Sequence, residues 1–390
     1  EQFEGIYDII ISNPPYKKLV KSSEEAVLMG KVVHGQPNIY FLFMAMSIKL
    51  LKTGGEMIFI TPRSFTSGAY FKSFRNYLLD NTMITNIHIF NSRNNLFKGE
   101  EVLQETIITR AIKKFSGEVE RNLFMIAKCP EICATDDKEE ENSKYDINLT
   151  ISENANFEHM KKIDVCYSDL ITGCANRFIL LPSSAEEVEI LKKLCKYTDN
   201  LITLGFKLKT GKVVDFRATE YLTKEQDGAV PLFWSDNFKD NKIVAVDNED
   251  NYRYILCNDS SKKLVQENKE YILVKRFTSK EEFRRIQPAI YNKDNFKDFD
   301  KIGIENHVNF IEKNKGYMSI EEQYGIFCYF NSTLIDKYYR IINGNTQVNA
   351  TEFNAIPMPS INIVIAMGND LLNFNDISTD TCDSIIRKYI

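Results

Sequence analysis

Residues 7–16 read YDIIISNPPY, a short apolar run that ends in the turn Asn13-Pro14-Pro15-Tyr16. The run is rich in β-branched residues, which predicts a strand. Two successive prolines fix φ at both positions and restrict the residue before each, so we expect the strand to end in a stiff turn. Such a turn would hold the Asn13 carboxamide and the Tyr16 ring at a set distance. An amide oxygen accepts a hydrogen bond from an amino group and a ring stacks on a flat heterocycle, so the pair could bind an aromatic amine. A plain proline turn beside a buried tyrosine is the structural alternative.

Strands and helices alternate through the first part of the chain. Residues 38–52 have apolar side chains at helical spacing and end at Thr53-Gly54-Gly55, a helix stop signal. The pattern predicts strands at 56–61, 84–90 and 106–112 and an amphipathic helix at 70–79. This alternation indicates an α/β fold with a largely parallel sheet, in which ligands bind beyond the carboxyl ends of the strands. The NPPY turn follows such an end.

A change in composition divides the chain into parts. Residues 131–156 are polar and include the acidic run DDKEEE at 136–141, which predicts a linker or an insertion. Residues 157–390 contain Tyr- and Phe-rich strand-like segments together with helical stretches at 187–197 and 323–340. We therefore expect one domain over residues 1–130 and a second, mixed α+β domain over residues 157–390.

The composition excludes several classes of protein. No apolar run reaches the roughly 18 residues that a membrane span requires. The 8 cysteines and 4 histidines show no spacing typical of a metal site, so no bound metal is expected. The net charge is −5, but basic residues gather at 207–217 and 262–285. Because a nucleic-acid partner requires a basic face rather than a basic total, DNA binding stays open.

Several segments resemble one enzyme family. Residues 7–16 resemble the strand and catalytic loop of DNA methyltransferases that modify the exocyclic amine of adenine. Residues 38–65 and 91–114 are similar to the helix, glycine turn, strands and aromatic loop that follow in that family. Residues 208–217, 271–285 and 342–359 resemble the C-terminal target-recognition domain of the gamma-class, TaqI-like type II enzymes. The resemblance implies the C-terminal part of a Rossmann-like methyltransferase sheet (residues 1–130), followed by a mixed α+β target-recognition domain.

The resemblance also implies a mechanism and a set of catalytic residues. The enzyme would transfer a methyl group from S-adenosylmethionine to the N6 amine of an adenine flipped out of double-stranded DNA. The Asn13 side-chain oxygen and the Pro14 carbonyl would accept hydrogen bonds from that amine, in a turn completed by Pro15. Tyr16 would stack on one face of the base and Phe97 on the other, unless Phe97 is an ordinary core or loop aromatic. This is catalysis by positioning and electrostatics, without a metal.

One feature departs from the family pattern. Its members place the glycine-rich loop and the acidic residues that bind S-adenosylmethionine before the catalytic loop, whereas this sequence starts twelve residues before Asn13. We therefore expect the main cofactor site upstream of residue 1, with Asn13 as the contact present here. The upstream part would belong to a longer enzyme or to a separate chain.

The second domain contains the expected DNA contacts. Basic residues of two segments would bind phosphates, and amides of a third would contact base edges. The amides have an alternative role in which they hydrogen-bond to their own backbone. Asn306 and His307 are weaker candidates, since a structural histidine is the simpler interpretation. The expected residues are Lys207, Lys209, Lys212, Arg217, Lys275, Arg276, Arg284, Arg285, Asn345, Gln347 and Asn349.

Three other functions stay open. A bifunctional restriction–modification enzyme would need a nuclease triplet of two carboxylates and a lysine, which is not evident in this sequence. A DNA-recognition subunit without catalysis is disfavoured by the intact NPPY turn. Methylation of protein or RNA uses similar turns, but the second domain favours DNA. We expect a bacterial, cytoplasmic protein that associates with the nucleoid through DNA.

Overall fold

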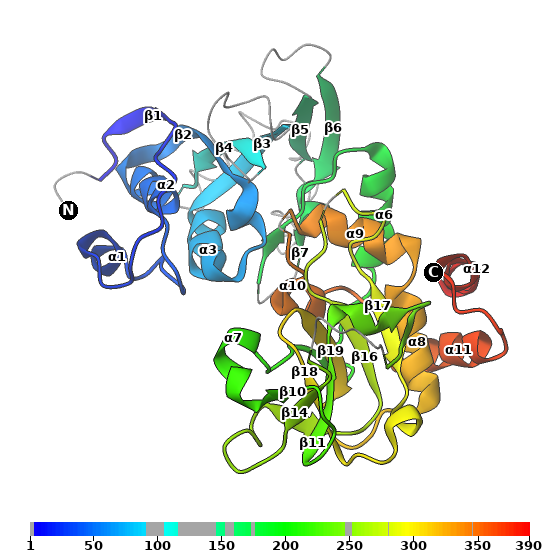
Figure 1. Cartoon of the computed structure of the whole chain (residues 1–390). Coiled ribbons are helices and arrows are strands. Elements are labelled where there is room, and N and C mark those ends of the chain that lie inside the picture. The colour runs from blue at the N-terminus through cyan, green and yellow to red at the C-terminus, as the bar shows by residue number, and fades with distance from the viewer. Residues whose placement is uncertain are drawn as a thin grey trace. The chain divides into compact units, whose positions relative to one another are not determined.

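The computed structural model describes residues 4–90, 105–115, 146–152, 160–172, 176–245, 252–279, 281–344 and 346–390. The chain forms two compact units, residues 1–192 and 193–390, which divide inside helix α6 (Ala185–Cys195). Both units combine helices with mixed sheets (Figure 1). The predicted α/β fold class is thus confirmed.

A six-stranded sheet organises the first unit, in the order β1-β2-β4-β3-β5-β6. The β1–β2 and β3–β5 pairs are parallel, and the other three pairs are antiparallel. The prediction of a largely parallel sheet is therefore wrong, because β4 lies between β2 and β3 and is antiparallel to both. Apolar patterning identifies a strand but does not set its direction or its neighbours. The strands are β1 (Tyr7–Ser12), β2 (Leu51–Pro62), β3 (Thr82–Phe90), β4 (Thr106–Lys113), β5 (Asp146–Ser152) and β6 (Lys161–Cys166).

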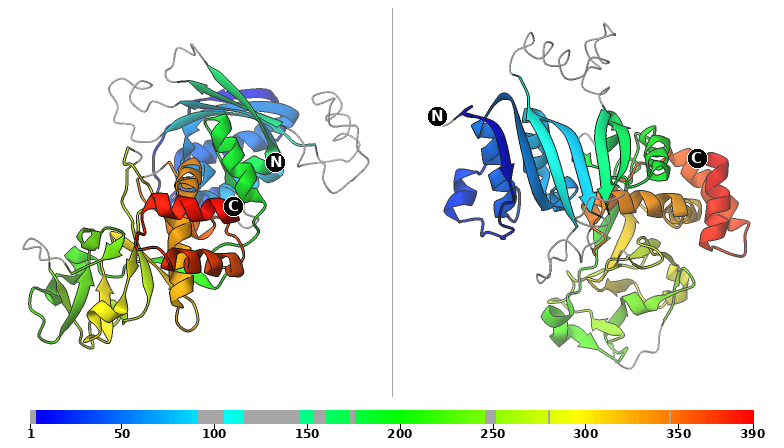
Figure 2. Two further views of the ribbon diagram at one scale, coloured as in Figure 1. Left: turned by 90° about the vertical axis from the view of Figure 1, so that its right-hand side faces the viewer. Right: turned by 90° about the horizontal axis from the view of Figure 1, so that it is seen from above.

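Two helices pack on the inner strands of this sheet. Helix α2 (Ile39–Leu50) packs on β2, α3 (Lys72–Asn81) packs on β3, and the two helices contact each other (Figure 2). The short helix α1 (Glu24–Leu28) lies in the segment between β1 and α2. Both predicted helices are confirmed. The predicted glycine stop falls within β2, where Gly54 has a φ of +76° at a shift in the β1–β2 register.

The acidic segment contains a strand that the sequence analysis missed. Residues 146–152, inside the expected linker, form β5 and pair with β3 and β6. Alternate residues Ile147, Leu149 and Ile151 are buried, which explains why this stretch joins the sheet. The first unit then continues beyond the expected boundary through α5 (Tyr167–Leu170), β7 (Ile171–Thr172) and β8 (Phe178–Ile179).

Two sheets form the second unit, in the orders β10-β14-β11-β18-β15 and β12-β13-β17-β16-β19-β9. Their facing side chains make a buried core that includes Phe233, Tyr271, Tyr291 and Phe310. The strands are β9 (Phe206–Thr210), β10 (Leu222–Thr223), β11 (Ala229–Phe233), β12 (Phe238–Lys239), β13 (Lys242–Ile243), β14 (Tyr254–Leu256), β15 (Val265–Glu267), β16 (Tyr271–Lys275), β17 (Pro288–Tyr291), β18 (Lys301–Ile304) and β19 (Val308–Lys313).

Helices complete the second unit. Helix α8 packs on β16 and β17, and α11 and α12 pack on α8. The predicted helix at 323–340 is two helices, because the first ends at Phe330 with Asn331 as its C-cap, and Ser332 caps the second by accepting a hydrogen bond from the amide of Ile335. No helix in the described ranges is long and apolar enough to cross a membrane. The helices are α7 (Asp215–Ala218), α8 (Ile320–Phe330), α9 (Thr333–Ile342), α10 (Ala350–Asn354), α11 (Ile361–Leu372) and α12 (Thr379–Tyr389).

Candidate functional site

The NPPY turn begins directly after β1 and contacts the neighbouring strand. The Tyr16 hydroxyl lies 2.8 Å from the side-chain oxygen of Asn13 and 3.0 Å from the carbonyl oxygen of Ile60 on β2. A hydroxyl has one hydrogen, so it donates to one of these acceptors at a time. Pro14 is buried, whereas Asn13 is exposed. The turn therefore presents a carboxamide oxygen to solvent and connects it through Tyr16 to β2.

The Tyr16 ring packs against Tyr40 in the first turn of α2. The two ring centroids are 6.1 Å apart with the planes at 86°, an edge-to-face geometry that aromatic quadrupoles favour. Tyr40 is fully buried, and its hydroxyl lies 3.0 Å from Ser64 Oγ. Burial raises the pKa of Tyr16 to about 12. Its hydroxyl therefore remains a neutral donor at physiological pH.

A buried ion pair lies at the same edge of the sheet. Arg63 directly follows β2 and Glu105 directly precedes β4, and their side chains are 9% and 3% exposed. The guanidinium Nη1 lies 2.5 Å from Glu105 Oε2, and the Arg63 amide donates to the Glu105 carbonyl at 2.8 Å. A buried charge requires a close, hydrogen-bonded partner. The pair therefore holds two strand ends together at the edge where the NPPY turn lies.

The turn suits the reacting end of S-adenosylmethionine, the cofactor that the resemblance implies. A sulfonium is a cation, and both a carboxamide oxygen and the face of an aromatic ring attract cations. Asn13 and Tyr16 supply one of each. The sequence has no G-x-G pattern for the rest of the cofactor. Among the described residues, no group of three side chains could hold a metal ion.

Two predicted residues lie outside the described part of the chain. These are Phe97, the second base-stacking candidate, and Asn345 in the amide loop. Their roles stay predictions.

Three of the predicted phosphate-binding residues are exposed on the second unit: Lys207, Lys212 and Arg217. The Arg217 guanidinium lies 5.3 Å from the ring centroid of Phe216, which is itself 73% exposed. Lys209 instead pairs with the Glu312 carboxylate on the adjacent strand β19. The exposed three are therefore better placed for phosphate contacts than Lys209.

The predicted role of Arg285 is wrong. Arg285 is 1% exposed, and its guanidinium donates to the Thr278 carbonyl and to Asn343 Oδ1. Arg284 donates to two carbonyl oxygens at the α8–α9 junction, at 3.3 and 3.2 Å. Burial lowers the pKa of both guanidinium groups. A guanidinium that is enclosed in this way cannot reach a phosphate. The hydrogen bonds of Arg285 therefore stabilise the interior of the unit.

Four segments that are distant in the sequence meet at the start of β19. Residues 276–278 pair with 346–348, and residues 305–308 hydrogen-bond to Arg276 and to the segment 211–213. A Cβ on Gly211 would lie 2.1 Å from the carbonyl oxygen of Glu305, so only glycine permits this approach. The structure thus brings together predicted residues from separate segments.

An aromatic pair lies where these segments meet. The rings of Phe277 and His307 are 4.8 Å apart, and the Arg276 guanidinium lies 5.3 Å from the Phe277 centroid. Phe277 is 42% exposed and the His307 side chain is 48% exposed. Arg276 also donates to the Asn306 carbonyl at 2.8 Å. We call the surface formed by Arg276, Phe277, Asn306, His307 and Gln347 the 277–307 surface.

Glu305 lies beneath this surface with no exposed side-chain area. Its Oε1 accepts from His307 Nδ1 at 2.7 Å, and its Oε2 accepts from the His307 amide at 2.8 Å. Burial raises the pKa of Glu305, and these hydrogen bonds oppose that shift. Phe277 and Glu305 could not be identified as site residues from the sequence, because no spacing pattern links them to each other.

The two described amide side chains of the loop that contains Asn345, Gln347 and Asn349 have different environments. Asn349 Nδ2 lies 3.3 Å from Glu352 Oε2, and the Asn349 amide donates to the Tyr339 hydroxyl at 3.1 Å. This matches the structural alternative. The half-buried Gln347 side chain makes no hydrogen bond to any residue that the structure describes. Of the two predicted amides that the structure describes, Gln347 is therefore the one whose side chain remains able to contact a ligand.

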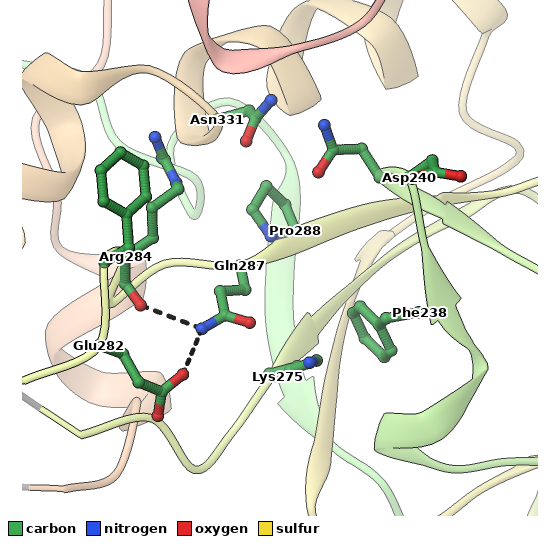
Figure 3. A pocket seen from close by; sticks show the side chains of 10 residues that line it. Phe238, Asp240, Lys275, Glu282, Arg284, Gln287, Pro288 and Asn331 are labelled. Carbon is green, nitrogen blue, oxygen red and sulfur yellow. Dashed lines mark hydrogen bonds between the residues drawn. The ribbon is translucent and has the colours of Figure 1, made fainter.

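A pocket of about 370 Å³ lies beside Lys275 in the second unit (Figure 3). Phe238 and the turn between β12 and β13 line one side, and residues 282–284, 287 and 288 line the other. Gln287 donates to Glu282 Oε2 at 2.6 Å, and the Lys275 ammonium lies 5.7 Å from the Phe238 ring centroid. Lys275 and Arg284 therefore line the same pocket.

Comparison with known proteins gives matches over the whole chain. Residues 1–97 match a family described as Eco57I restriction-modification methylase. The type II methyltransferase M.PstI of Providencia stuartii is 35% identical over 390 residues, which are 100% of this chain and 72% of the relative. The type II methyltransferase M.BsuBI of Bacillus subtilis is 33% identical over 97% of this chain and 71% of the relative. No match supports a separate chain that supplies the N-terminal part.

A similar fold is found among solved structures. The type IIL restriction-modification enzyme MmeI, solved in complex with DNA, aligns with a TM-score of 0.51 at 13% identity. The alignment covers 97% of this chain and 52% of that one, so it reports on the arrangement of the elements alone.

Proposed function

This chain belongs to the family of type II methyltransferases, and we propose that it methylates the exocyclic amine of adenine within a specific DNA sequence. The observation that carries this proposal is the exposed Asn13 carboxamide, which is hydrogen-bonded to Tyr16 in the NPPY turn. The names of the family model and of the relatives support DNA as the substrate.

The turn can activate an aromatic amine by hydrogen bonding. The amine of adenine is a poor nucleophile because its lone pair is delocalised into the ring. Hydrogen bonds from the two N–H groups to Asn13 Oδ1 and to the Pro14 carbonyl would localise the lone pair. The same oxygens would stabilise the positive charge that develops on the nitrogen during transfer. No covalent intermediate with the protein is needed.

Tyr16 has two functions in this proposal. Its half-buried ring provides one stacking face for the base. Its hydroxyl can donate to Asn13 or turn to the Ile60 carbonyl, so it need not compete with the substrate. A carboxamide oxygen has two lone pairs, and Asn13 can accept from the amine while Tyr16 holds its orientation.

The methyl donor and the DNA complete the reaction. S-adenosylmethionine supplies an electrophilic methyl group when it is bound. The target amine lies inside a duplex, so the base must leave the stack to reach Asn13. Phe97 is the proposed second stacking ring. The residues of this chain then orient the amine and cover one face of the base.

The second unit is proposed to bind and read the DNA. Lys207, Lys212 and Arg217 are exposed and suited to phosphate contacts, and Lys275 lines a pocket of the same unit. The 277–307 surface offers a guanidinium, an amide and aromatic rings, which are groups that contact base edges. This arrangement fits a unit that positions the enzyme on a particular sequence.

A comparison of modified nucleosides tests the proposal. The full-length enzyme, wild type or Asn13→Ala, is expressed in a host that lacks DNA methylation, and genomic DNA is analysed by nucleoside mass spectrometry and single-molecule sequencing. We expect N6-methyladenine in one short sequence with the wild type and none with Asn13→Ala, which should still bind DNA.

The control is Asn295→Ala, which changes an exposed asparagine in the second unit and should retain methylation. The detection of N4-methylcytosine in place of N6-methyladenine would contradict the adenine assignment. Activity of Asn13→Ala within a few-fold of wild type would contradict the role of the turn.

A further inference from the structure

A buried carboxylate holds an exposed imidazole in the second unit. Both carboxylate oxygens of Glu305 accept hydrogen bonds from His307, one from the ring and one from the backbone. Burial of a carboxylate is unfavourable unless hydrogen bonds compensate for lost water. Here the compensating donors belong to a residue whose side chain is 48% exposed. Glu305 therefore orients a surface side chain as well as completing the interior.

The contact determines which ring nitrogen faces outward. A carboxylate only accepts hydrogen bonds, so Nδ1 of His307 carries a hydrogen. Phe277 packs on the ring at 4.8 Å and restricts its rotation. None of the residues described by the structure hydrogen-bonds to Nε2. Nε2 is therefore a polar atom in a set position that is available to a ligand.

The surroundings of this nitrogen favour a base edge as the ligand. The Arg276 guanidinium and the Gln347 amide lie on the same surface, and both are groups that read bases in a DNA groove. A phosphate contact tolerates a mobile lysine, whereas a choice between bases requires a donor or acceptor in a fixed direction. The His307 ring, held by Glu305 and Phe277, meets that requirement.

We propose that His307 determines specificity: its ring contacts the edge of one base pair in the recognition sequence, and Glu305 is the residue that positions it. The inference rests on the proposed function, since it assigns a role in DNA reading. It also assigns a ligand contact to a histidine for which a structural role was the simpler interpretation.

The test measures base preference position by position. The full-length enzyme methylates a duplex library randomised around the target adenine, and methylated molecules are sequenced. We expect His307→Ala and His307→Gln to reduce the preference at one base pair, or at two adjacent ones, by about tenfold. The other positions should keep their preference. Glu305→Gln should change the same position, because an amide presents an N–H to the His307 donors.

The control lies at the opposite end of β19. Tyr317 is 60% exposed, and its hydroxyl lies 2.7 Å from a Glu267 carboxylate oxygen, so it is a similar exposed ring held by a carboxylate. Tyr317→Ala should leave the preference at every position unchanged. Thermal unfolding of each variant identifies any general loss of folded protein.

Two outcomes would overturn the inference. One is an unchanged preference profile in His307→Ala. The other is an equal loss at all positions together with a shallower salt dependence of binding, which indicates a phosphate contact. A failure of the proposed function is distinguishable, since the wild-type enzyme would then produce no methyladenine from the library.

Discussion

The Tyr16 hydroxyl donates to the side-chain oxygen of Asn13 across 2.8 Å, and the carbonyl of Ile60 offers it a second acceptor at 3.0 Å. The ring and the hydroxyl of Tyr16 therefore have separable functions. We expect Tyr16→Phe to lower kcat/KM by up to about tenfold, because it removes one hydrogen bond worth about 1 kcal/mol.

Tyr16→Ala should lower kcat/KM by a further factor of about 10 to 100, because it also removes base stacking worth about 1–3 kcal/mol. Steady-state kinetics on a duplex with one site measures both variants. Equal activity of the two variants would show that the ring does not contact the base.

Close packing between α8 and α11 depends on two glycines. A Cβ on Gly325 would lie 1.9 Å from the Val364 carbonyl, and a Cβ on Gly368 would lie 1.9 Å from the Glu321 carbonyl. We expect Gly325→Ala or Gly368→Ala to lower the free energy of unfolding by about 3 kcal/mol, because backbone atoms must separate. Urea denaturation measures the loss. The matched change Gly30→Ala, at an exposed position, should stay within about 0.5 kcal/mol of wild type.

Exposed cations should determine the salt dependence of DNA binding, despite the net charge of −5. Each phosphate contact contributes about 0.9 to the slope of log K against log salt concentration. Lys212→Ala and Arg217→Ala should each make the slope shallower by about that amount. Fluorescence anisotropy at several salt concentrations measures the slope. Lys388→Ala is the control, since Lys388 pairs with Asp370 on α11, and binding that does not respond to salt would refute the basic surface.

Buried phenols should make the protein less stable in alkali. Burial raises the pKa of Tyr16 to about 12 and also raises the pKa values of Tyr271, Tyr291, Tyr329 and Tyr339 above the usual 10.0. In the unfolded chain these groups lose their protons first. The stabilising contribution of these tyrosines is therefore complete below about pH 10, and it is lost as the pH rises through their pKa values in the folded protein.

The urea midpoint should accordingly be steady between about pH 8 and about pH 10 and fall above that range. Each proton that only the unfolded chain releases contributes about 1.4 kcal/mol per pH unit to the decline. Tyr291→Phe removes one of these protons, so the free energy of unfolding should decline by about 1.4 kcal/mol less per pH unit than in the wild type. A midpoint that does not change up to about pH 11 would contradict the role of burial.

Local elements were predictable because they depend on local sequence. The apolar spacing of residues 39–50 and the prolines after β1 act within a few residues, and helix α2 and the NPPY turn follow from them. The largely parallel sheet was wrong, because strand direction depends on pairing partners elsewhere in the chain. Strand β5 was missed because the acidic composition around it outweighed its three alternating apolar residues, Ile147, Leu149 and Ile151.

The basic residues show the same difference between what the sequence predicts and what the tertiary structure decides. Lysine and arginine in the sequence predict a charged surface, yet Arg285 is buried and hydrogen-bonded to Thr278 and Asn343. A long basic side chain can donate hydrogen bonds either to carbonyl oxygens in the interior or to a phosphate of DNA. The burial of the side chain decides which of these two contacts it can make.

The sequence by itself determined the NPPY turn, because two prolines restrict the backbone of adjacent residues. It also indicated the family, because the motifs that resemble that family can be identified along the chain without knowledge of the tertiary structure. Only the tertiary structure decided that Tyr16 contacts Ile60 and that Glu305 lies beneath His307 and Phe277. Hydrogen bonds and ring contacts between distant segments form when strands pair, and strand pairing leaves no regular spacing in the sequence.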